Sequence, residues 1–441
     1  MNKKNIYMKN ILSFFIVLIL FTNIESYSQN KSFVKVENGK FIRDGEQYRY
    51  VGTNFWYGSI LGSTGEGGDR NRLIQELDSL KSIGIDNLRI LVGSDGENGV
   101  PTKVEPTLQK APGVYNDTIL DGLDYLLFEM NKRDMLAVLY INNSWEWSGG
   151  YGQYLEWAGM GKAPIPAIDG YEKYMKFVSQ FSTCEKAQNY YYDHLKFIIG
   201  RVNRYTNKRY IDDFTIMSWQ IGNEPRAFSN DAKPAFAKWL SKASSIIRSL
   251  DKNHLISTGN EGKAGCEEDM NLFETINADK NVDYITIHMW PYNWGWVKAD
   301  SLYEMLPQAK VKTKEYIETH LSIADKYNKP VVMEEFGYPR DDFKFAKGSS
   351  TKARDDFYKY VFGLIANKSE NYRHFAGCNF WAWGGMARQS EKNIFWKKGD
   401  DYMGDPAQEQ QGLNSVFLGD STIKIIKEST KLINDNDDII K

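Results

Sequence analysis

Two glutamates, Glu224 and Glu335, stand where an apolar, strand-like run gives way to a loop. The first run ends in Asn-Glu-Pro (223–225) and the second contains Glu-Phe-Gly (335–337). Either glutamate alone is a weak signal, because a glutamate followed by Pro or Phe is common. Two carboxyl groups that face each other from strand ends, however, are the minimum equipment for cleaving a glycosidic bond.

The two runs belong to a regular alternation of short apolar segments with longer amphipathic ones. The predicted strands are 48–54, 87–92, 136–142, 214–222, 255–258, 284–288, 331–336 and 377–383. Helical patterns cover 70–83, 120–132, 187–205, 233–250, 315–327, 353–365 and 422–432. Eight strands, each followed by a helix or a helix-sized segment, predict an α/β fold of the (β/α)₈ TIM-barrel type. In such a barrel the ends of strands four and seven lie across the mouth from each other, so Glu224 and Glu335 are expected to point into it.

A short N-terminal β-hairpin is predicted ahead of the barrel, because residues 33–45 alternate around Asn-Gly and Asp-Gly turns. A doubly wound open sheet is the alternative architecture. Its phosphate-binding turn would follow the first strand, but segment 62–68 has glycines without the required spacing and lacks a Lys-Ser/Thr pair. Because no linker or repeat interrupts the chain, residues 30–441 are interpreted as one domain.

Composition argues against several kinds of partner. The 55 basic and 57 acidic residues are interspersed and leave a net charge of −2, so nucleic acid is not an expected partner. The five histidines show no ligand spacing with each other or with cysteine, and neither a metal nor an organic cofactor is expected. Cys184, Cys266 and Cys378 are far apart and odd in number, which predicts buried free thiols. A monomer is expected.

The N-terminus has the layout of a secretory signal, predicted over residues 1–29. Lys3, Lys4 and Lys9 precede an apolar run at 11–21 and a polar stretch at 22–30. The run is shorter than the ~20 residues that a membrane-spanning helix needs. We therefore expect export to the periplasm or the exterior, with no membrane span in the mature chain. An uncleaved anchor or a buried helix is the alternative.

Aromatic residues are abundant, with 12 Trp, 27 Tyr and 23 Phe, and most of the Phe are expected in the core. Several tryptophans instead lie near Gly, Asn or Pro in predicted loops: Trp145, Trp147, Trp294 and Trp296. A flat ring at such a place is suited to stacking against a sugar. The long connection 142–183 also holds Tyr151, Tyr154 and Trp157, and connections of this length are usually functional or disordered. It is interpreted as an aromatic binding loop at the mouth of the barrel.

Together these motifs resemble glycoside hydrolase family 5 of the retaining (β/α)₈ clan. The resemblance rests on segments 223–225 and 335–337, with Arg89, His288 and Trp381 closing strands two, six and eight. More narrowly, four segments look like that family's endo-β-1,4-mannanases: 142–151 (NNSWEWSGGY), 380–385 (FWAWGG), 404–406 (GDP) and 411–417 (QGLNSVF). The resemblance covers nearly everything from Phe33 to Leu432.

The resemblance implies that Glu224 is the acid/base and Glu335 the nucleophile. It also implies substrate-binding roles for a set of residues near the strand ends: Arg89, Asn142, Asn143, Trp145, Asn223, His288, Trp290 and Trp381. Asn223 resembles the amide that hydrogen-bonds the sugar 2-hydroxyl, Trp381 resembles the platform under the cleaved ring, and Arg89 would pair with Glu335 and lower its pKa. The alternatives are a structural ion pair for Arg89, a satisfied core imidazole for His288 and ordinary packing for Trp381.

Two details of the pattern concern the environment of Glu335. Since side chains alternate along a strand, Glu334 is expected to point away from Glu335. Family members usually carry a Tyr two residues after the strand-six His, positioned to hydrogen-bond the nucleophile, but this chain has Trp290 there. An indole N–H can donate one hydrogen bond, so Trp290 is a candidate substitute.

The resemblance thus implies a retaining endo-β-1,4-mannanase that hydrolyses internal bonds of mannan, glucomannan or galactomannan by double displacement. Its partners would be β-mannan polysaccharide or manno-oligosaccharides. Another β-glycanase, such as a cellulase of the same family, is an alternative because only loop residues discriminate these sugars. A barrel that binds polysaccharide without catalysis is the second alternative, although the intact Glu224 and Glu335 favour an enzyme. Endo and exo action both stay open.

Overall fold

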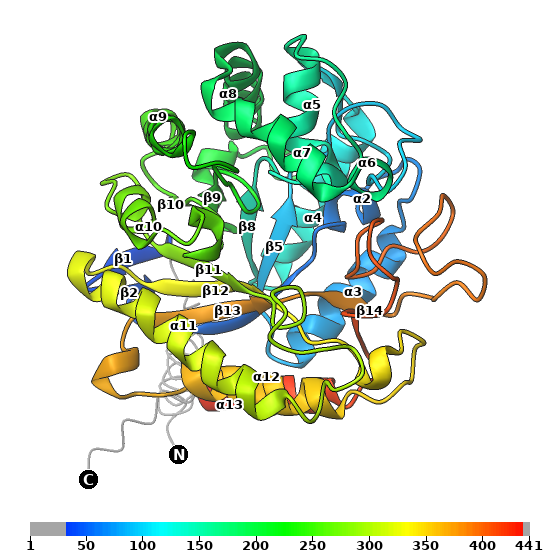
Figure 1. The fold of residues 1–441 in the computed structure, drawn as a ribbon, viewed down its shortest axis with the longest axis vertical. Coiled ribbons are helices and arrows are strands. Elements are labelled where there is room, and N and C mark those ends of the chain that lie inside the picture. Colours follow the sequence, from blue (N-terminus) through cyan, green and yellow to red (C-terminus); the bar gives the residue numbers. More distant parts are fainter. Residues whose placement is uncertain (1–31, 435–441) are drawn as a thin grey trace, which may run out of the picture. The chain divides into compact units, whose positions relative to one another are not determined.

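All eight predicted barrel strands are present in the computed structural model, which describes residues 32–434 (Figure 1). They are β4 (Tyr50–Asn54), β5 (Asn87–Leu91), β8 (Leu136–Tyr140), β9 (Ile216–Gln220), β10 (Leu255–Ser257), β11 (Ile285–Met289), β12 (Val331–Phe336) and β13 (Phe375–Phe380). They form one parallel sheet in the order β10-β9-β8-β5-β4-β13-β12-β11. The predicted signal segment lies outside the described residues.

The sheet nearly closes into a barrel between β10 and β11. The backbone N–H of Asp283 donates to the carbonyl of Ile256 at 2.8 Å, and the N–H of His288 donates to the carbonyl of Glu261 at 2.9 Å. The first bond joins β10 to the residues just before β11, and the second joins β11 to the residues just after β10. The predicted (β/α)₈ barrel is therefore confirmed, and the predicted strand segments agree with the observed ones to within a few residues at each end.

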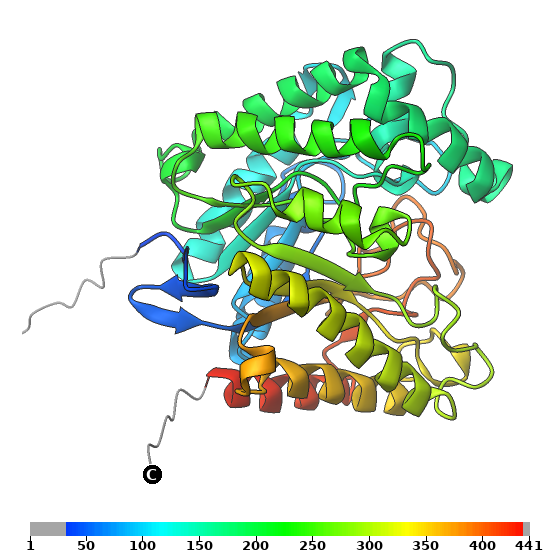
Figure 2. The same cartoon turned by 60° about the vertical axis from the view of Figure 1, so that its left-hand side comes forward.

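Helices surround the strands, as Figures 1 and 2 show. The main ones are α3 (Arg70–Ser82), α4 (Asp117–Lys132), α8 (Glu185–Ile199), α9 (Lys233–Leu250), α10 (Met270–Asn277), α11 (Leu306–Tyr327), α12 (Lys352–Ile365) and α13 (Thr422–Asn434), with a single turn at α2 (Gly58–Leu61). Local sequence sets several starts: Asp69 accepts a hydrogen bond from the backbone N–H of Arg72, and Asp269 caps α10 in the same way. No described helix has the length and apolar character needed to cross a membrane.

The N-terminal segment forms a three-stranded antiparallel sheet rather than a single hairpin: β1 (Lys35–Glu37), β2 (Lys40–Arg43) and β3 (Glu46–Tyr48). Both predicted turns are present, and Asn38 and Asp44 have the positive φ that two-residue hairpin turns require. Phe41 is buried in a cluster that includes Tyr50, the first residue of β4. The small sheet therefore covers the end of the barrel where the strands begin (Figure 2).

The opposite end of the barrel carries the long connections. The one after β8 is ordered and contains η1 (Glu146–Ser148), α5 (Gly150–Trp157), α6 (Pro166–Asp169), α7 (Tyr171–Val178) and η2 (Ser179–Thr183). The one after β13 runs from β14 (Trp383–Gly385) to β15 (Val416–Phe417), which pair in parallel and hold the ends of segment 386–415 together. The short strands β6 (Gln109–Ala111) and β7 (Val114–Tyr115) follow β5. The remaining single turns are η3 (Tyr210–Asp212), η4 (Ala264–Cys266), η5 (Asp341–Phe343) and η6 (Glu370–Tyr372).

All three cysteines are free. Cys266 and Cys378 are buried, as predicted, whereas Cys184 is only half-buried at the start of α8. The prediction of buried thiols is therefore wrong for Cys184.

Candidate active site

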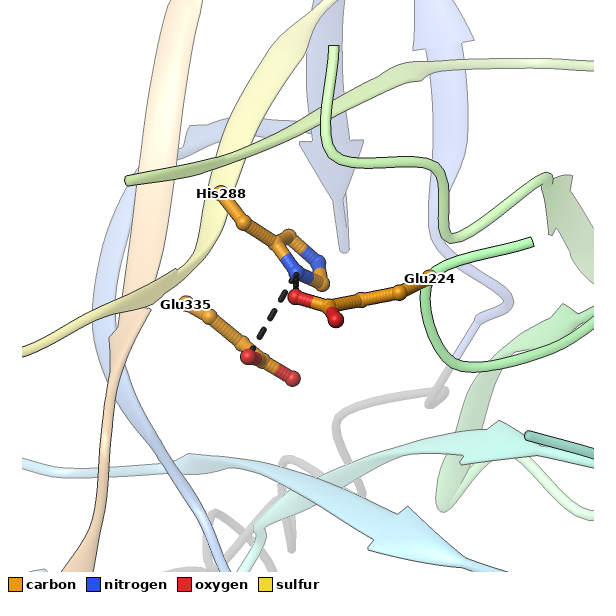
Figure 3. A group of neighbouring side chains, drawn as sticks. All are labelled: Glu224, His288 and Glu335. Atoms are coloured by element: carbon orange, nitrogen blue, oxygen red, sulfur yellow. Dashed lines mark hydrogen bonds and ion pairs between the residues drawn. The ribbon is translucent and has the colours of Figure 1, made fainter. Parts of the chain in front are cut away.

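Glu224 and Glu335 meet at the end of the barrel where the strands finish (Figure 3). One carboxylate oxygen of each and a ring nitrogen of His288 all lie within 4.8 Å of one another. Nδ1 of His288 is 2.8 Å from Oε1 of Glu224 and 3.4 Å from Oε2 of Glu335. Among the described residues these three also have a spacing that could hold a metal ion. The facing carboxyl groups expected from the two strand ends are thus brought together.

The backbone at Glu224 is held in an unusual conformation. Its φ is 50°, in the left-handed region that a residue with a Cβ seldom adopts. Its N–H donates to the carbonyl of Gly259 at 3.0 Å, and its own carbonyl accepts from the hydroxyl of Ser144. Residues held in this region cost about 1–3 kcal/mol and persist where the surroundings fix them. Neighbouring loops therefore hold this carboxyl group in place.

Arg89, at 0% exposure, connects Glu335 to three amide side chains. Its Nη1 donates to Oε1 of Glu335 at 2.6 Å, and its Nη2 donates to Oδ1 of Asn223 at 2.8 Å. Nη1 also donates to Oδ1 of Asn54 at 3.0 Å, and Nε donates to Oε1 of Gln220 at 2.8 Å. One charged group from β5 thereby fixes the orientation of both Glu335 and Asn223, and the ion pair is part of the site.

Glu334 does not point away from Glu335. Its Oε2 accepts a hydrogen bond from Gln220 and lies 3.7 Å from Nε of Arg89, so both glutamates contact the same guanidinium group. The cause is a β-bulge: along β11, Ile287 pairs with Met333 but His288 pairs with Glu335, which leaves Glu334 as an extra residue. The expectation from strict alternation is wrong here, because the bulge turns both side chains toward the barrel interior.

Asn223 lies in the wall of the cavity, whereas Asn142 and Asn143 lie behind it. Asn223 donates to Oδ1 of Asn143 at 3.2 Å, and Asn143 donates to the hydroxyl of Ser148 at 3.0 Å. The side chain of Asn142 accepts from the backbone N–H of Asn143 at 2.6 Å. Neither Asn142 nor Asn143 lines the cavity, so their place in the site is to support Asn223 from the interior.

The cavity has a volume of about 350 Å³ and an aromatic lining. Five tryptophans contribute to it: Trp145, Trp147, Trp290, Trp294 and Trp381. Trp381 is 3% exposed and meets Trp147 and Trp290 edge-on, with ring centroids 6.3 Å and 6.0 Å away. Its indole N–H is buried and makes no hydrogen bond to the described residues. The N–H lies close to the carboxyl group of Glu409, whose charged form it favours, so Trp381 can offer a ring face to a ligand beside that group.

The aromatic loop after β8 only partly faces the cavity. Trp145 is half-buried and Trp147 is buried, and both line the cavity. Tyr151, however, is 1% exposed and stacks on Phe181 at 4.0 Å, and Trp157 borders a different hollow. The prediction that Tyr151 and Trp157 lie at the mouth is wrong, because the loop folds into α5, which buries Tyr151 against Phe181 and turns Trp157 toward the other hollow.

Trp290 lines the cavity but makes no hydrogen bond to Glu335 within the described chain. Its ring instead packs against Gly337, so closely that a Cβ atom at that position would lie 2.7 Å from it. The donor to Glu335 is Arg89, with Nδ1 of His288 nearby. The structure therefore places Trp290 as a wall residue, and the expected substitution of an indole for the usual Tyr is not observed.

Several polar residues of the cavity were missed by the sequence reasoning, among them Arg226, Glu261 and Asn293, and three more have an unpaired buried oxygen. Gln408 and Glu409 come from segment 386–415, and Glu146 comes from the loop after β8; all three line the cavity. A side-chain oxygen of each is buried and makes no hydrogen bond of normal geometry to the described residues, although the carboxyl group of Glu409 lies close to Asp405, Asn414 and Trp381. Burial raises the pKa of Glu146 to about 7, and burial followed by the charge of Asp405 raises the pKa of Glu409 well above its usual range. Buried polar atoms are normally paired, so these three oxygens are available to accept hydrogen bonds from water or from a ligand in the cavity.

The environment of the two facing carboxyl groups disfavours the state in which both are ionised. Burial raises the pKa of Glu335 well above its usual range, the charge of Glu224 adds to this, and Arg89 opposes it. Burial also raises the pKa of Glu224, against Arg226 and the hydrogen bond from Trp145. Groups this close titrate as a pair. Burial and Arg89 lower the pKa of His288 well below 6.5, so its imidazole is neutral.

Comparison with known proteins agrees with this geometry. A family model described as "GH family 5 beta-mannosidase-like" matches residues 31–438. The chain belongs to glycoside hydrolase family 5. The resemblance expected from the motifs at 223–225 and 335–337 is thereby confirmed, and the protein is a family 5 glycoside hydrolase.

Solved and curated relatives agree with this assignment. A family 5 mannosidase from Rhizomucor miehei matches with a TM-score of 0.84 and 34% identity, covering 91% of this chain and 97% of its own. Mannan endo-1,4-beta-mannosidase 1 from Arabidopsis thaliana is 27% identical over 85% of this chain and 88% of its own length. Mannan endo-1,4-beta-mannosidase 4 from Solanum lycopersicum is 29% identical, but the match spans 62% of this chain and 66% of that protein.

Proposed function

We propose that this protein is a retaining, exo-acting β-mannosidase that releases mannose from the non-reducing ends of β-mannan chains and manno-oligosaccharides. The observation that carries the proposal is the polar end of the cavity, where Gln408 and Glu409 stand in the same wall as Trp381. The β-mannosidase-like branch of the family and the likeness to the Rhizomucor miehei mannosidase support mannose as the sugar.

The spacing of the carboxyl groups supports double displacement. Retaining glycosidases place the two groups about 5–5.5 Å apart, whereas inverting enzymes leave roughly 6.5–9.5 Å for a water. An oxygen of Glu224 within 4.8 Å of an oxygen of Glu335 fits the shorter class. Glu335 would attack the anomeric carbon as the glycosidic bond breaks, and Glu224 would transfer its proton to the departing oxygen. Water activated by Glu224 would then release the sugar from Glu335.

Local charge supports this division of roles. The raised pKa values of the pair favour one shared proton, and the positive guanidinium of Arg89 against Oε1 of Glu335 favours the ionised form of that group. In the proposed mechanism the shared proton is assigned to Glu224, because only Glu335 has the direct guanidinium partner. Burial and the charge of Glu224 nevertheless raise the pKa of Glu335 more strongly than burial raises that of Glu224. Asn223, held by Arg89 and Asn143, is placed to hydrogen-bond the sugar beside the bond that is cleaved.

Exo action follows from what the polar end of the cavity can accept. Hydroxyl groups of a terminal sugar can satisfy the unpaired oxygens of Gln408 and Glu409. A chain that continued past this end would have to leave them unpaired or displace segment 386–415, and leaving a buried polar group unpaired costs about 1–3 kcal/mol. The site therefore favours the end of a chain over its middle.

An endo-β-1,4-mannanase is the second candidate, because the curated relatives carry that name. In that case segment 386–415 would line an open groove and internal bonds would be cut. A barrel that only binds polysaccharide is disfavoured, because binding alone does not require the facing Glu224 and Glu335 held by Arg89.

The action pattern on mannopentaose reduced at its reducing end separates these functions. Exo action should release free mannose and reduced mannotetraose from the first minutes, with the mannose appearing as the β-anomer by proton NMR. Early mannobiose and mannotriose together with a rapid fall in galactomannan viscosity would establish endo action instead. Inverted α-mannose would reject double displacement, and the absence of any cleavage would leave only binding.

A further inference from the structure

A second hollow adjoins the candidate active site and shares Arg226 and Trp294 with it. This outer hollow has a volume of about 570 Å³, larger than the cavity itself. Its remaining wall comes from the loops after β10 and β11 and from the exposed side of α11, including Lys263, Trp296 and Tyr316. The two spaces are therefore neighbours on one surface, separated by the side chains of Arg226 and Trp294.

Aromatic rings form one wall of the outer hollow. The ring of Trp294 lies 5.2 Å from that of Trp296 and 5.1 Å from that of Tyr316, and all three side chains are half-buried. Tyr316 is fixed in place, because its hydroxyl donates to the carbonyl of Glu261 at 2.8 Å. Half-exposed aromatic faces that neighbouring residues hold still can stack against a ligand at little cost in side-chain entropy.

Polar groups of both signs surround these rings. Nζ of Lys312 lies 5.7 Å from the centroid of Trp296, and Lys263 pairs with the exposed Glu268 at 3.1 Å. Three basic and two acidic side chains line the hollow. Two of the basic ones are already paired, Arg226 with Glu261 and Lys263 with Glu268, so little net charge faces a ligand. Such a lining offers hydrogen-bond donors and acceptors to hydroxyl groups but gives no advantage to an anionic or cationic ligand. A neutral sugar fits this chemistry best.

The outer hollow also lies on the side expected for the leaving part of a substrate. Arg226, Lys263 and Trp294 follow β9, β10 and β11, which are neighbours in the barrel, whereas Gln408 and Glu409 follow β13. A terminal sugar bound at Gln408 and Glu409 would direct the rest of its chain away from them, past Arg226 and Trp294.

We propose that the outer hollow binds neutral β-linked hexose units on the reducing-end side of the cleaved bond, beyond the unit that directly follows it. This inference rests on the proposed function. It makes the protein selective for oligosaccharides over mannobiose, because only a longer chain reaches Trp296 and Tyr316 while its first unit occupies the cavity. Binding energy gained there is remote from the reacting bond and can contribute to its cleavage.

The test is kcat/KM for mannobiose through mannohexaose, measured on the full chain. Trp296→Ala removes a ring face, and Thr319→Trp fills the outer hollow from an exposed position of α11. Both should lower kcat/KM for mannotetraose and longer substrates roughly five-fold, the usual worth of one aromatic contact, and leave mannobiose unchanged. Thr275→Trp is the matched control: this exposed helical threonine makes the same hydroxyl contact to the backbone but is not part of the hollow.

The outcomes separate the subsite from the function it rests on. A wild-type profile that is flat beyond mannobiose, or equal length profiles for wild type, Trp296→Ala and Thr319→Trp, overturns the subsite and leaves the mannosidase proposal standing. Failure of the wild-type protein to cleave any manno-oligosaccharide overturns both. Thr319→Trp keeps the test valid if the Trp296 variant misfolds. Thr319 is exposed, so its replacement leaves the packed rings of Trp294, Trp296 and Tyr316 intact.

Discussion

The indole N–H of Trp145 donates a 2.5 Å hydrogen bond to Oε2 of Glu224, so the loop after β8 directly touches the carboxyl group that follows β9. The guanidinium of Arg226 lies 5.3 Å from the centroid of the same indole, and Arg226 in turn pairs with Glu261. The loops after β8, β9 and β10 therefore meet around the carboxyl group of Glu224. The hydrogen bond favours the ionised form of Glu224 and lowers its pKa against the effect of burial.

Trp145→Phe should raise the pKa of Glu224, because the phenyl ring cannot donate to the carboxylate. If Glu224 must be protonated to act, the alkaline limb of kcat/KM should move to higher pH by about one unit, the worth of one hydrogen bond to a charged group. The measurement is a pH–rate profile on a manno-oligosaccharide. Trp157→Phe, in the same connection but beside a different hollow, should leave the profile unchanged. A lower melting temperature with an unshifted profile would assign Trp145 to packing alone.

Glu335→Ala should lower kcat by several orders of magnitude with the fold intact, because it removes the group that attacks the anomeric carbon. Added azide should restore activity on an activated aryl mannoside. Azide then forms the new bond to the anomeric carbon from the vacated face as the aryl oxygen departs, giving an inverted mannosyl azide. Circular dichroism checks the fold, and NMR identifies the product.

Glu334→Gln is the matched comparison for this experiment. Glu334 also contacts Arg89 but is bound by Gln220 and Tyr284 within the barrel. The variant should lose part of its activity through disturbed placement of Arg89, and azide should not restore it. If azide rescued a Glu334 variant while Glu335→Ala stayed active, the assignment of the nucleophile would be reversed.

The sequence was sufficient for the barrel and for the residues at its strand ends. Runs such as 331–333 (Val-Val-Met) and 136–141 (Leu-Ala-Val-Leu-Tyr-Ile) are apolar, and they need no distant partner to be recognised as strands. Arg89, Asn223 and His288 close such runs, so their meeting at one end follows from the fold alone. Export, by contrast, rests on residues 1–29, which lie outside the described part, and it stays a prediction.

Features set by pairing between distant segments were not predictable in this way. The bulge at Glu334 depends on how β12 aligns with β11, and no local signal in residues 331–336 marks it. The arrival of Glu409 at the cavity depends on contacts of segment 386–415, such as Asp405 accepting from the backbone N–H groups of Gly412 and Asn414. A weak hint existed in the sequence, since Asp405 belongs to the Gly-Asp-Pro motif used for the resemblance.

Glu224→Gln should reduce cleavage of manno-oligosaccharides far more than cleavage of 2,4-dinitrophenyl β-mannoside. A sugar leaving group needs a proton from Glu224, whereas dinitrophenolate departs without one, and proton donation contributes about 10²–10⁴-fold. Steady-state and burst kinetics on both substrates provide the comparison. A burst followed by slow turnover of the aryl mannoside would show that the intermediate forms but lacks its base. Equal losses on the two substrates would argue against Glu224 as the acid.

Glu409→Ala tests whether the polar end of the cavity recognises a terminal sugar. The variant removes a buried carboxyl oxygen that has no hydrogen bond of normal geometry to the described residues, so kcat/KM for mannobiose should fall by about ten-fold, as for a lost hydrogen bond. The melting temperature should stay equal or rise, because an unsatisfied buried carboxyl group destabilises the protein without ligand. Glu391→Ala, an exposed glutamate of the same segment, should change neither quantity. Release of mannobiose from reduced mannopentaose should also increase, since the end wall is shortened. A Glu409→Ala protein that melts earlier yet cleaves mannobiose at the wild-type rate would make Glu409 a structural residue and remove the main support for exo action.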